Sequence, residues 1–220
     1  MDDAAGWFPS ACVASPHHLA SATGLRVLAS GGNALDAAIA TNLTLAVVTP
    51  YLCGFGGDLF AIVWQDGAHG YNGSGRAPAR ASIDFITRQV RGDSMPLFGP
   101  HSVTVPGAVA GWFDLLDRFG TRGFGDLAAD ARRYAEEGFE LSAAAADVIR
   151  RSRARYEGEK DWLEVYGEAR PGRMFRQQPL ARTIDRLSTK GSSAFYRGEI
   201  GAAIVRTLQA RGASMTIEDD

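Results

Sequence analysis

The residues with the clearest capacity for chemistry lie in one short, glycine-rich corner of the chain. The sequence there reads Asn72-Gly73-Ser74-Gly75-Arg76-Ala77-Pro78. Glycines allow the backbone to approach a ligand closely, Ser74 can donate a hydrogen bond, and Arg76 adds a fixed cation that suits a carboxylate. This combination predicts a small pocket for an anion or an amide, with Ser74, Gly75 and Arg76 as its candidate substrate-binding residues.

Other common catalytic patterns are missing from the sequence or have the wrong spacing. Ser74 does not match a nucleophile elbow, because an asparagine stands where the first glycine of that motif belongs. The adjacent His17 and His18 cannot share one helix face as zinc ligands. Cys12 and Cys53 form no CxxC pair, and neither has a base nearby in the sequence to activate it. The chain shows no nucleophile–base pair of its own.

Several charged residues have a structural interpretation beside a functional one. Arg76 either binds a ligand or pairs with a carboxylate such as Asp58 or Asp84, and the sequence leaves both interpretations open. Arg80 is expected at the surface. The basic run at residues 150–155 is typical of a solvated helix face near a C-terminus, with an anion site as the alternative.

A hairpin must hold the glycine-rich corner in place. Leu59 to Trp64 is a continuous run of apolar, β-branched and aromatic residues, which predicts a central, buried strand. Asp66-Gly67 is a strong signal for a two-residue hairpin loop. His69 to Asn72 is then the returning strand. The glycines of the preceding loop, residues 51–58, are expected to form a backbone turn, with lining of the pocket as the alternative.

Two helices are predicted before this hairpin. Ala11 to Ala14 reads as a short buried strand, and Ser15-Pro16 then predicts a helix start. Gly31-Gly32 should end that helix. Asn33 is expected to cap a second helix that runs through Val48, and a role in the site is the alternative for this asparagine and for the aspartate three residues on. The second helix is apolar on all sides, so it should be buried.

The remaining chain is predicted to be mainly helical. Ser102 to Val105 reads as one more strand, and helical periodicity dominates afterwards. The pattern predicts an α+β fold and a single domain. Within it we expect a flexible lead at residues 1–10, a sheet with core helices at 11–107, and a mainly helical part at 108–220.

Composition narrows the class of protein. The chain has 220 residues, of which 45% are apolar and 22% charged, so a globular core is expected. A net charge of −2 argues against a nucleic-acid partner. The start of the chain lacks a signal-peptide pattern, and no apolar stretch is long enough to span a bilayer. We therefore expect a cytoplasmic protein with no membrane partner.

Ordered blocks along the sequence resemble the gamma-glutamyltransferase family, which contains gamma-glutamyltranspeptidases and related acylases. Their order and spacing look like the large-subunit half of that family, from about Ala11 to the last residue. The blocks are Val13 to Ala20, Gly31 to Ala38, Pro50 to Asp58, Ser102 to Gly107 with Ala110-Gly111, Ala135 to Phe139, and Ala194 to Ile200.

The resemblance implies part of an N-terminal-nucleophile hydrolase fold, in which two sheets lie between helix layers (αββα). It also implies a precursor that cuts itself before a threonine, whose hydroxyl attacks a gamma-glutamyl or similar amide while its amine acts as base. That threonine belongs to the small subunit, so no catalytic residue is expected in this chain. The expected partners are that small subunit and a small acyl-amide substrate, and no metal or organic cofactor is implied.

One position departs from the pattern of the transpeptidases. There an arginine binds the α-carboxylate of the substrate, and counting back from Ala77-Pro78 places Ser74 at this position. A serine supplies no charge and no bidentate clamp. Arg76, two residues later, is a candidate replacement. The departure weakens the expectation of a glutathione-like donor and favours an acylase-like relative.

Three hypotheses remain at this point. The first is the substrate-side portion of an autoprocessed gamma-glutamyltransferase-like amidohydrolase, inactive by itself. The second is a non-catalytic binding or regulatory protein derived from the same fold. The third is an unrelated metabolite-binding α+β domain, which ordered strands between Leu59 and Asn72 would disfavour.

Overall fold

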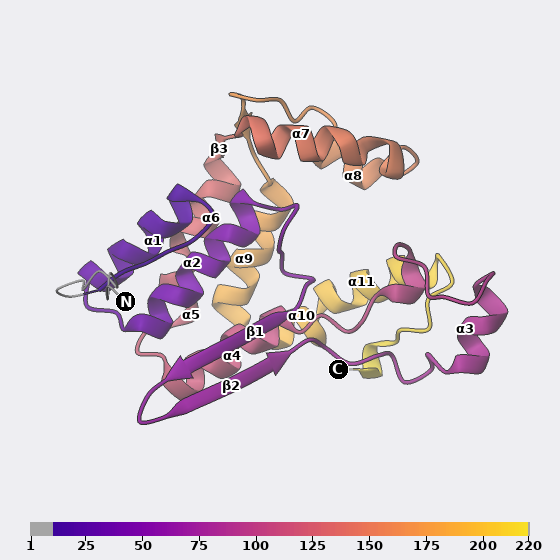
Figure 1. Cartoon of the computed structure of the whole chain (residues 1–220), viewed down its shortest axis with the longest axis horizontal. Helices are drawn as coiled ribbons and strands as arrows, with labels where there is room; N and C mark the ends of the chain where they lie inside the picture. The colour runs from indigo at the N-terminus through magenta and orange to yellow at the C-terminus, as the bar shows by residue number, and fades with distance from the viewer. Residues whose placement is uncertain (1–10, 220) are drawn as a thin grey trace, which may run out of the picture. The chain divides into compact units, whose positions relative to one another are not determined.

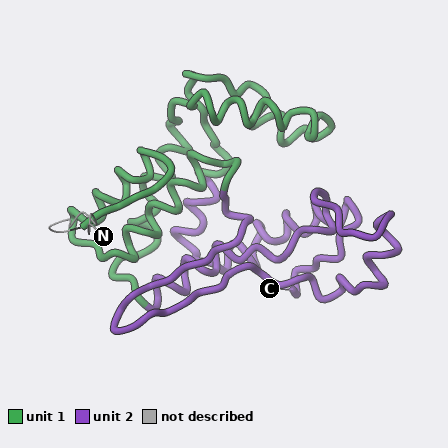
Figure 2. The backbone as a smooth tube through the Cα atoms, viewed as in Figure 1, with its two compact units in different colours: residues 1–52, 119–181 green, residues 53–118, 182–220 purple. Residues whose placement is uncertain are grey.

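The computed structural model describes residues 11–219 and mixes helices with short strands (Figure 1). The chain forms two compact units, each built from two separate stretches of sequence (Figure 2). Unit 1 draws on Met1–Leu52 and Phe119–Ala181, and unit 2 on Cys53–Arg118 and Arg182–Asp220. The flexible lead predicted for residues 1–10 lies outside the described residues.

The core of unit 1 is the helix pair α1 (His18–Ala29) and α2 (Ala34–Val48) (Figure 1). Most residues of α2 are buried, because α1, α5 (Phe124–Leu127) and α6 (Ala129–Glu137) all pack against it. The helix is therefore buried on most of its surface, and only Ala34 and Ala38 are exposed. The predicted buried helix and its predicted bounds are confirmed.

Asn33 caps α2 through the capping box that its sequence predicts. The backbone N–H of Asp36 donates to Asn33 Oδ1, and the N–H of Asn33 donates to Asp36 Oδ2, both at 2.9 Å. Asp36 is fully buried and also accepts a hydrogen bond from the N–H of Thr121 at 3.0 Å and one from the Thr121 hydroxyl. The Asn33 amide donates to the carbonyl of Phe119 at 2.7 Å. The cap thus also fixes the 119–122 loop.

The first predicted elements of the chain differ from the structure. Ala11 to Ala14 form no strand, and Cys12 is exposed, because no described segment pairs with this stretch. Helix α1 begins at His18, after the predicted Ser15-Pro16 start, with the ring of His17 accepting from the N–H of Leu19 at 3.3 Å. Ser15 instead donates to the carbonyl of His17. The predicted end of α1 at Gly31-Gly32 is confirmed.

The rest of unit 1 is helical apart from one short antiparallel strand pair. Strands β3 (Phe139–Glu140) and β4 (Met174–Phe175) pair through Phe139↔Phe175 and Glu140↔Met174. The helices between these strands are α7 (Ala143–Ser152), η2 (Arg153–Tyr156) and α8 (Lys160–Tyr166). Helix α9 (Gln178–Lys190) then starts in unit 1 and ends in unit 2.

Unit 2 contains the predicted hairpin. Strands β1 (Leu59–Trp64) and β2 (Ala68–Gly73) are antiparallel, with Leu59 opposite Gly73 and Trp64 opposite Ala68. Three residues, Gln65 to Gly67, separate the paired ends, so the prediction of a two-residue loop was wrong. Asp66 adopts a left-handed conformation with φ 56°, which matches its turn chemistry.

Strand β1 is not the central strand that its apolar run predicts. Within the described residues it pairs only with β2. Leu59 is buried and touches the site of Gly111, where an added Cβ would lie 2.5 Å from Leu59 Cδ2. The alternate side chains point outward, with Phe60 64%, Ile62 84% and Trp64 80% exposed. Period-2 geometry therefore leaves one face of this two-stranded sheet apolar and uncovered.

The predicted strand at Ser102 to Val105 is also wrong. Pro100 to Ser102 form the short helix η1, and the backbone after it is extended with a single backbone hydrogen bond, from Val105 N–H to the carbonyl of Arg76 at 2.9 Å. One such bond does not make a ladder. The helices of unit 2 are α3 (Ile83–Gln89), α4 (Ala108–Phe119), α10 (Ser193–Tyr196), α11 (Glu199–Gln209) and η3 (Ile217–Asp219).

The mainly helical character predicted beyond residue 108 agrees with these bounds, apart from the β3–β4 pair. Among residues 11–219, no helix combines the length and apolarity that crossing a lipid bilayer requires.

Candidate functional site

The glycine-rich corner follows directly from the end of β2 and rests on the extended segment before α4. The N–H of Ser74 bonds to Asn72 Oδ1 at 3.0 Å, which closes a tight side-chain turn. The Thr104 hydroxyl donates to the carbonyl of Ser74 at 3.4 Å, and Val105 N–H donates to the carbonyl of Arg76. The corner is therefore held through the backbone groups of Ser74 and Arg76, and these bonds do not use the side chains of those two residues.

Backbone packs directly against backbone at this contact. A Cβ added to Gly75 would lie 1.8 Å from the carbonyl oxygen of Val105, and Gly75 has φ +77°. A Cβ added to Gly107 would lie 2.0 Å from the carbonyl oxygen of Gly73. Only glycine fits such an approach. The glycines that the sequence offers for ligand access thus serve first to bring two chain segments together.

Tyr196, at the end of α10, fastens the same segment to α4. The N–H of Ala110 donates to Tyr196 Oη at 2.8 Å, and Tyr196 Oη donates to the carbonyl of Pro106 at 2.7 Å. Residues 106 and 110 have the i, i+4 spacing of a helical hydrogen bond. The Tyr196 hydroxyl lies between this carbonyl and this N–H and bonds to both, at the start of α4. The structure assigns this role to a tyrosine that sequence reasoning did not single out.

A second tyrosine supports the base of the corner from β2. Tyr71 Oη donates to Asp114 Oδ2 at 2.9 Å. Burial, together with the hydrogen bond and the charge of Asp114, raises the pKa of Tyr71 to about 12. Tyr71 therefore keeps its proton at neutral pH, and it acts as a hydrogen-bond donor instead of a base.

These elements line an open cavity of about 700 Å³ within unit 2. It brings together Ser74, Gly75 and Arg76, the three residues that the sequence predicts. Other lining residues come from α10 and the residues beside it, and from the segment before α4. Sequence reasoning missed them because these parts are far apart in the chain. The lining residues are Tyr71 to Arg76, Val105 to Gly107, Ala110, Ser192, Ser193, Tyr196, Arg197 and Asp219.

Positive charge predominates in the lining. Arg76 and Arg197 both line the cavity and are exposed, and within residues 11–219 neither takes part in an ion pair. The alternative pairing of Arg76 with Asp58 or Asp84 is thus not seen there. Arg80 is exposed, as predicted.

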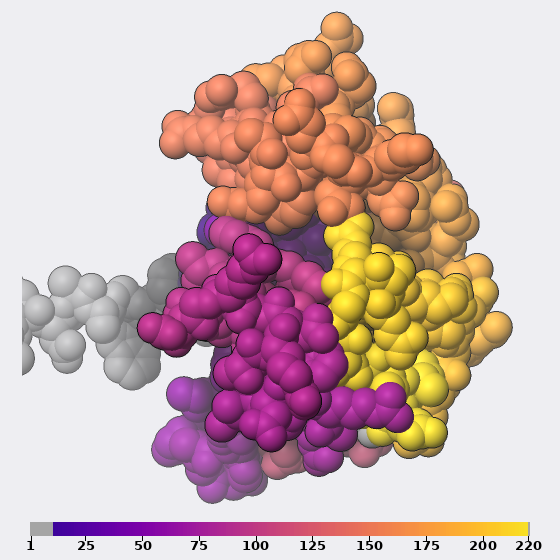
Figure 3. Space-filling view, turned by 90° about the vertical axis from the view of Figure 1, so that its right-hand side faces the viewer, coloured from indigo at the N-terminus to yellow at the C-terminus, as the bar shows by residue number. Residues whose placement is uncertain are grey.

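Among the described residues, Asp219 is the one carboxylate in the lining, and it is already engaged. Asp219 Oδ1 accepts from the N–H of Ala79 at 2.8 Å, and Oδ2 accepts from the N–H and hydroxyl of Thr216 at 2.6 and 3.1 Å. Partial burial raises the pKa of Asp219, but these hydrogen bonds outweigh it and lower the pKa overall. The segments on either side of the Ala79–Asp219 bond form neighbouring surfaces, magenta and yellow in Figure 3.

The glycine loop before β1 acts as a scaffold and does not line this cavity. The carbonyl of Gly57 accepts hydrogen bonds from the N–H groups of Gly107 and Ala108, at 3.1 and 2.9 Å, and so fixes the start of α4. Gly57 N–H in turn bonds to the carbonyl of Gly54. The interpretation of these glycines as a backbone turn is confirmed. Asp58 is exposed and lies outside the lining.

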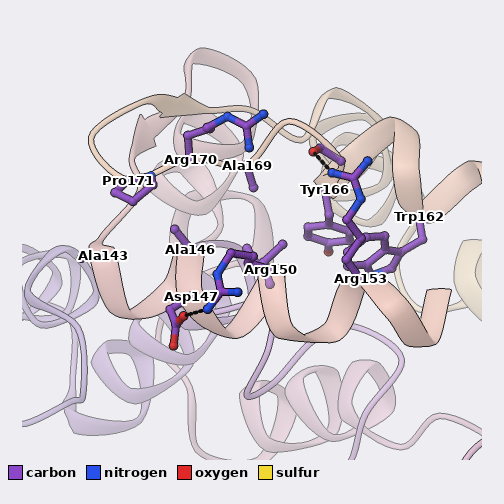
Figure 4. Close-up of a pocket in the computed structure, with 12 residues that line it drawn as sticks. Ala143, Ala146, Asp147, Arg150, Arg153, Trp162, Tyr166, Ala169, Arg170 and Pro171 are labelled. Carbon is purple, nitrogen blue, oxygen red and sulfur yellow. Dashed lines mark hydrogen bonds and ion pairs between the residues drawn. The ribbon is translucent and has the colours of Figure 1, made fainter. Parts of the chain in front are cut away.

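Two residues of the predicted basic run, Arg150 and Arg153, line a smaller cavity of about 260 Å³ in unit 1 (Figure 4). Arg150 and Arg151 both pair with Asp147 at 2.5 Å, and their side chains are 71% and 74% exposed. Arg153 bonds to the carbonyl of Gly167 at 3.4 Å, beside Trp162 (Figure 4). This is the solvated helix face that the charge pattern predicts, partly neutralised by its own aspartate.

Comparison with known sequences adds independent information. A sequence profile of the gamma-glutamyltranspeptidase family matches residues 20–219. The glutathione hydrolase-like YwrD proenzyme of Bacillus subtilis (strain 168) is 40% identical over 218 residues, covering 94% of this chain and 40% of that protein. The oxamate amidohydrolase proenzyme of Klebsiella pneumoniae is 36% identical over 218 residues, covering 93% of this chain and 40% of that protein. The chain thus spans 40% of the length of both relatives.

Solved structures show the same likeness. The gamma-glutamyltranspeptidase from Pseudomonas nitroreducens, complexed with L-DON, superposes with a TM-score of 0.89 at 29% identity. The match covers 97% of this chain and 64% of that one. Nearly the whole length of this chain is therefore similar in fold to part of a known enzyme.

Proposed function

The chain belongs to the gamma-glutamyltranspeptidase family, and on this basis we propose that it is the substrate-side part of the large subunit of an autoprocessed amidohydrolase. In this proposal the protein cleaves or transfers a gamma-glutamyl or related acyl group. A threonine at the N-terminus of a small subunit supplies the nucleophile. The chain itself contributes binding groups, so by itself it is inactive.

The observation that carries the proposal is the cavity at the glycine-rich corner. Its lining provides two guanidinium groups, the Ser74 hydroxyl and backbone carbonyls, but within the described residues no histidine or cysteine. Such a wall can hold an acyl group by its polar end, and it cannot by itself activate a hydroxyl or thiol. A binding wall of this kind fits an enzyme whose reactive group arrives from another polypeptide.

In the complete site, this chain binds the substrate and the small subunit supplies the reactive threonine. The threonine hydroxyl attacks the amide carbonyl, its own amine accepts the proton, and the amine of the substrate leaves with a proton. The resulting acyl-enzyme ester then passes its acyl group to water or to a second amine. Throughout, Arg76 and Ser74 hold the acyl chain in one orientation.

The uncovered sheet face supports the proposed partner and fold. Phe60, Ile62 and Trp64 form an apolar surface on β1 that is exposed to solvent in this chain, and a partner would cover it. We place the small subunit against this hairpin, where its strands extend the two-stranded sheet toward the αββα layers of an N-terminal-nucleophile hydrolase. The two-stranded sheet by itself is too small to be stable in isolation.

Ser74 bears on which acyl donor the protein prefers. Because this position carries no charge, we propose an acyl amide other than glutathione as the preferred donor, in keeping with an acylase-like branch of the family. The relatives themselves differ in the substrates that their names specify, glutathione for one group and oxamate for another. The family thus accommodates several amides on one scaffold.

The test is expression of the whole translated protein, followed by mass spectrometry and an assay with gamma-glutamyl and simple acyl anilides. We expect two polypeptides, the second beginning with threonine, and amide turnover that disappears when this threonine is replaced by alanine. The isolated 220-residue chain should show no turnover.

Two results would contradict the proposal. Turnover by the isolated chain would place the nucleophile within it. An uncut and inactive whole protein would instead support a non-catalytic binding protein built on the same fold.

A further inference from the structure

Arg197 is a second cation in the cavity at the glycine-rich corner, and neither the sequence motifs nor the proposed function assigns it a role. It lines the cavity directly after α10, more than a hundred residues along the chain from the corner. Many other arginines of the chain pair with carboxylates, for example Arg122 with Asp126 and Arg186 with Glu199. Within residues 11–219, Arg197 forms no such pair.

The backbone that carries Arg197 is held in place by hydrogen bonds and by buried residues just before it. Arg197 N–H donates to the carbonyl of Ser193 at 3.0 Å, and its neighbour Tyr196 bridges Ala110 and Pro106 through its hydroxyl. Ala194 and Phe195 before it are buried. A guanidinium on a fixed backbone loses less conformational freedom on binding an anion than one on a mobile loop does.

The neighbouring charges leave this cation available. Asp219 is the one carboxylate in the described lining, and both of its oxygens already accept hydrogen bonds from Ala79 and Thr216. Arg76 lines the same cavity and also lacks an ion-pair partner in the described part of the chain. Two guanidiniums facing one cavity repel each other until an anion lies between them.

We propose that Arg197 and Arg76 together bind a carboxylate on the acyl group of the substrate, and so determine its specificity in place of the charge that Ser74 does not supply. The preferred acyl donors are then monoamides of dicarboxylic acids, and neutral acyl amides are poor substrates. This inference rests on the proposed function for its substrate class, but the binding of a carboxylate can be measured without turnover. Arg197 is a binding residue here and takes no part in bond breaking.

The experiment measures binding of glutarate and of neutral glutaramide to the whole translated protein by isothermal titration calorimetry. We expect glutarate to bind more tightly than glutaramide. Arg197→Gln and Arg76→Gln should each weaken glutarate binding about tenfold, the usual order for loss of a charge-assisted hydrogen bond. The glutarate affinity of Arg197→Lys should lie between those of the unmodified protein and Arg197→Gln, because lysine keeps the charge and loses the bidentate geometry.

Arg206→Gln is the matched control. Arg206 is an exposed arginine on α11 outside the lining, so glutarate binding should stay unchanged. Glutarate binding by Arg197→Gln equal to that of the unmodified protein would overturn the inference, as would equal losses in Arg197→Gln and Arg206→Gln. Thermal unfolding of each variant shows whether it is folded, and a folded Arg197→Lys keeps the test decisive if Arg197→Gln is not.

Kinetics separate this inference from the proposed function. If the protein hydrolyses anilides, Arg197→Gln should raise KM for a glutaryl anilide about tenfold with little change in kcat, because the lost contact exists in both ground and transition states. A butyryl anilide should be unaffected. An absence of any hydrolysis would contradict the proposed function, and glutarate binding would still decide the role of Arg197.

Discussion

At the scale of single residues, Ser74 and Gly75 have different roles in the glycine-rich corner. Ser74 is half-buried in the cavity lining and contributes a hydroxyl where an arginine would contribute charge. Gly75 contributes no side chain and permits the contact with Val105. The first residue bears on substrate choice and the second on the shape of the pocket, so substitutions at the two positions should affect different measurements.

Ser74→Arg is expected to improve turnover of gamma-glutamyl substrates by the whole enzyme. A new charge-assisted pair with the α-carboxylate is worth roughly 1.5–3 kcal/mol, about ten- to a hundredfold in binding. The measurement is kcat/KM for a gamma-glutamyl anilide. Ser74→Gln is the matched control, because it adds length without charge and should give no gain. An unchanged or reduced kcat/KM for Ser74→Arg would argue against this role of position 74.

Gly75→Ala is expected to destabilise the protein and to damage the cavity. The new methyl group would lie 1.8 Å from the Val105 carbonyl oxygen at a φ of +77°, and backbone strain alone costs about 1–3 kcal/mol. Gly92→Ala separates the two effects, because Gly92 also has positive φ, +105°, but nothing lies within 4 Å of its added Cβ. Thermal unfolding should show a clearly larger loss for Gly75→Ala, and equal losses would mean that the Val105 contact is unimportant.

At the scale of elements, local signals predicted helices well and strand environments poorly. Asn33 with Asp36 predicted both the cap and the start of α2, because a capping box depends on residues close in sequence. The run Leu59 to Trp64 predicted a strand, but its burial depends on which segments lie beside it. The prediction of a strand at Ser102 to Val105 was wrong for the same reason, because a strand needs a neighbouring strand to pair with and local sequence does not reveal one.

The candidate site shows the same division. Ser74, Gly75 and Arg76 were predictable because they are adjacent in a glycine-rich corner. Tyr196 and Arg197 reach the same cavity from more than a hundred residues further along the chain, and no spacing rule connects them with the corner. The glycines of the 51–58 loop took the structural role that is commoner for such residues, whereas Cys12 is exposed and not in a buried strand.

Asp36→Asn is expected to lower the free energy of unfolding by about 1–3 kcal/mol at neutral pH, since a buried hydrogen-bonded group loses its charge. Burial raises the pKa of Asp36, but hydrogen bonds from Thr121, Asn33 and Arg122 outweigh it and lower the pKa overall. A lowered folded-state pKa means that the stabilisation is present above the ordinary carboxyl pKa of about 4 and is lost as pH falls through the folded-state value.

The difference in unfolding free energy between the unmodified protein and Asp36→Asn should therefore shrink in acid. Urea unfolding at several pH values measures it. Asp126→Asn is the control, because Asp126 is an exposed partner of Arg122 at 60% exposure and should cost well under about 1 kcal/mol. A difference that grew below pH 4 would contradict the assigned direction of the pKa shift.

At the scale of the whole molecule, the uncovered sheet face has a direct physical cost. Phe60, Ile62 and Trp64 lie on one side of β1, and exposed contiguous apolar surface of this kind favours association. The other face of the hairpin packs on α4 through Leu59 and Gly111. Leu59 of β1 thus packs inside unit 2, whereas Phe60, Ile62 and Trp64 of the same strand are uncovered.

The isolated 220-residue chain is expected to self-associate, and Ile62→Lys should reduce this association with little change in thermal stability. Ile62 is 84% exposed, so its replacement removes apolar surface from water contact without opening a cavity. Sedimentation velocity measures the association. Leu97→Lys is the matched control, since Leu97 is 87% exposed but lies outside the hairpin and should leave association unchanged. Equal effects of the two substitutions would show that the sheet face is not special.

The interleaving of the two units also sets an order of events during synthesis on the ribosome. Helix α2 is made early, but α5 and α6, which cover it, follow only after the whole first stretch of unit 2. The Thr121 that satisfies Asp36 comes 85 residues later in the chain. A nascent polypeptide that has not reached α6 therefore carries an apolar helix covered only by α1. Chaperones that hold such helices should engage this protein while it is being translated and release it once residue 137 has emerged.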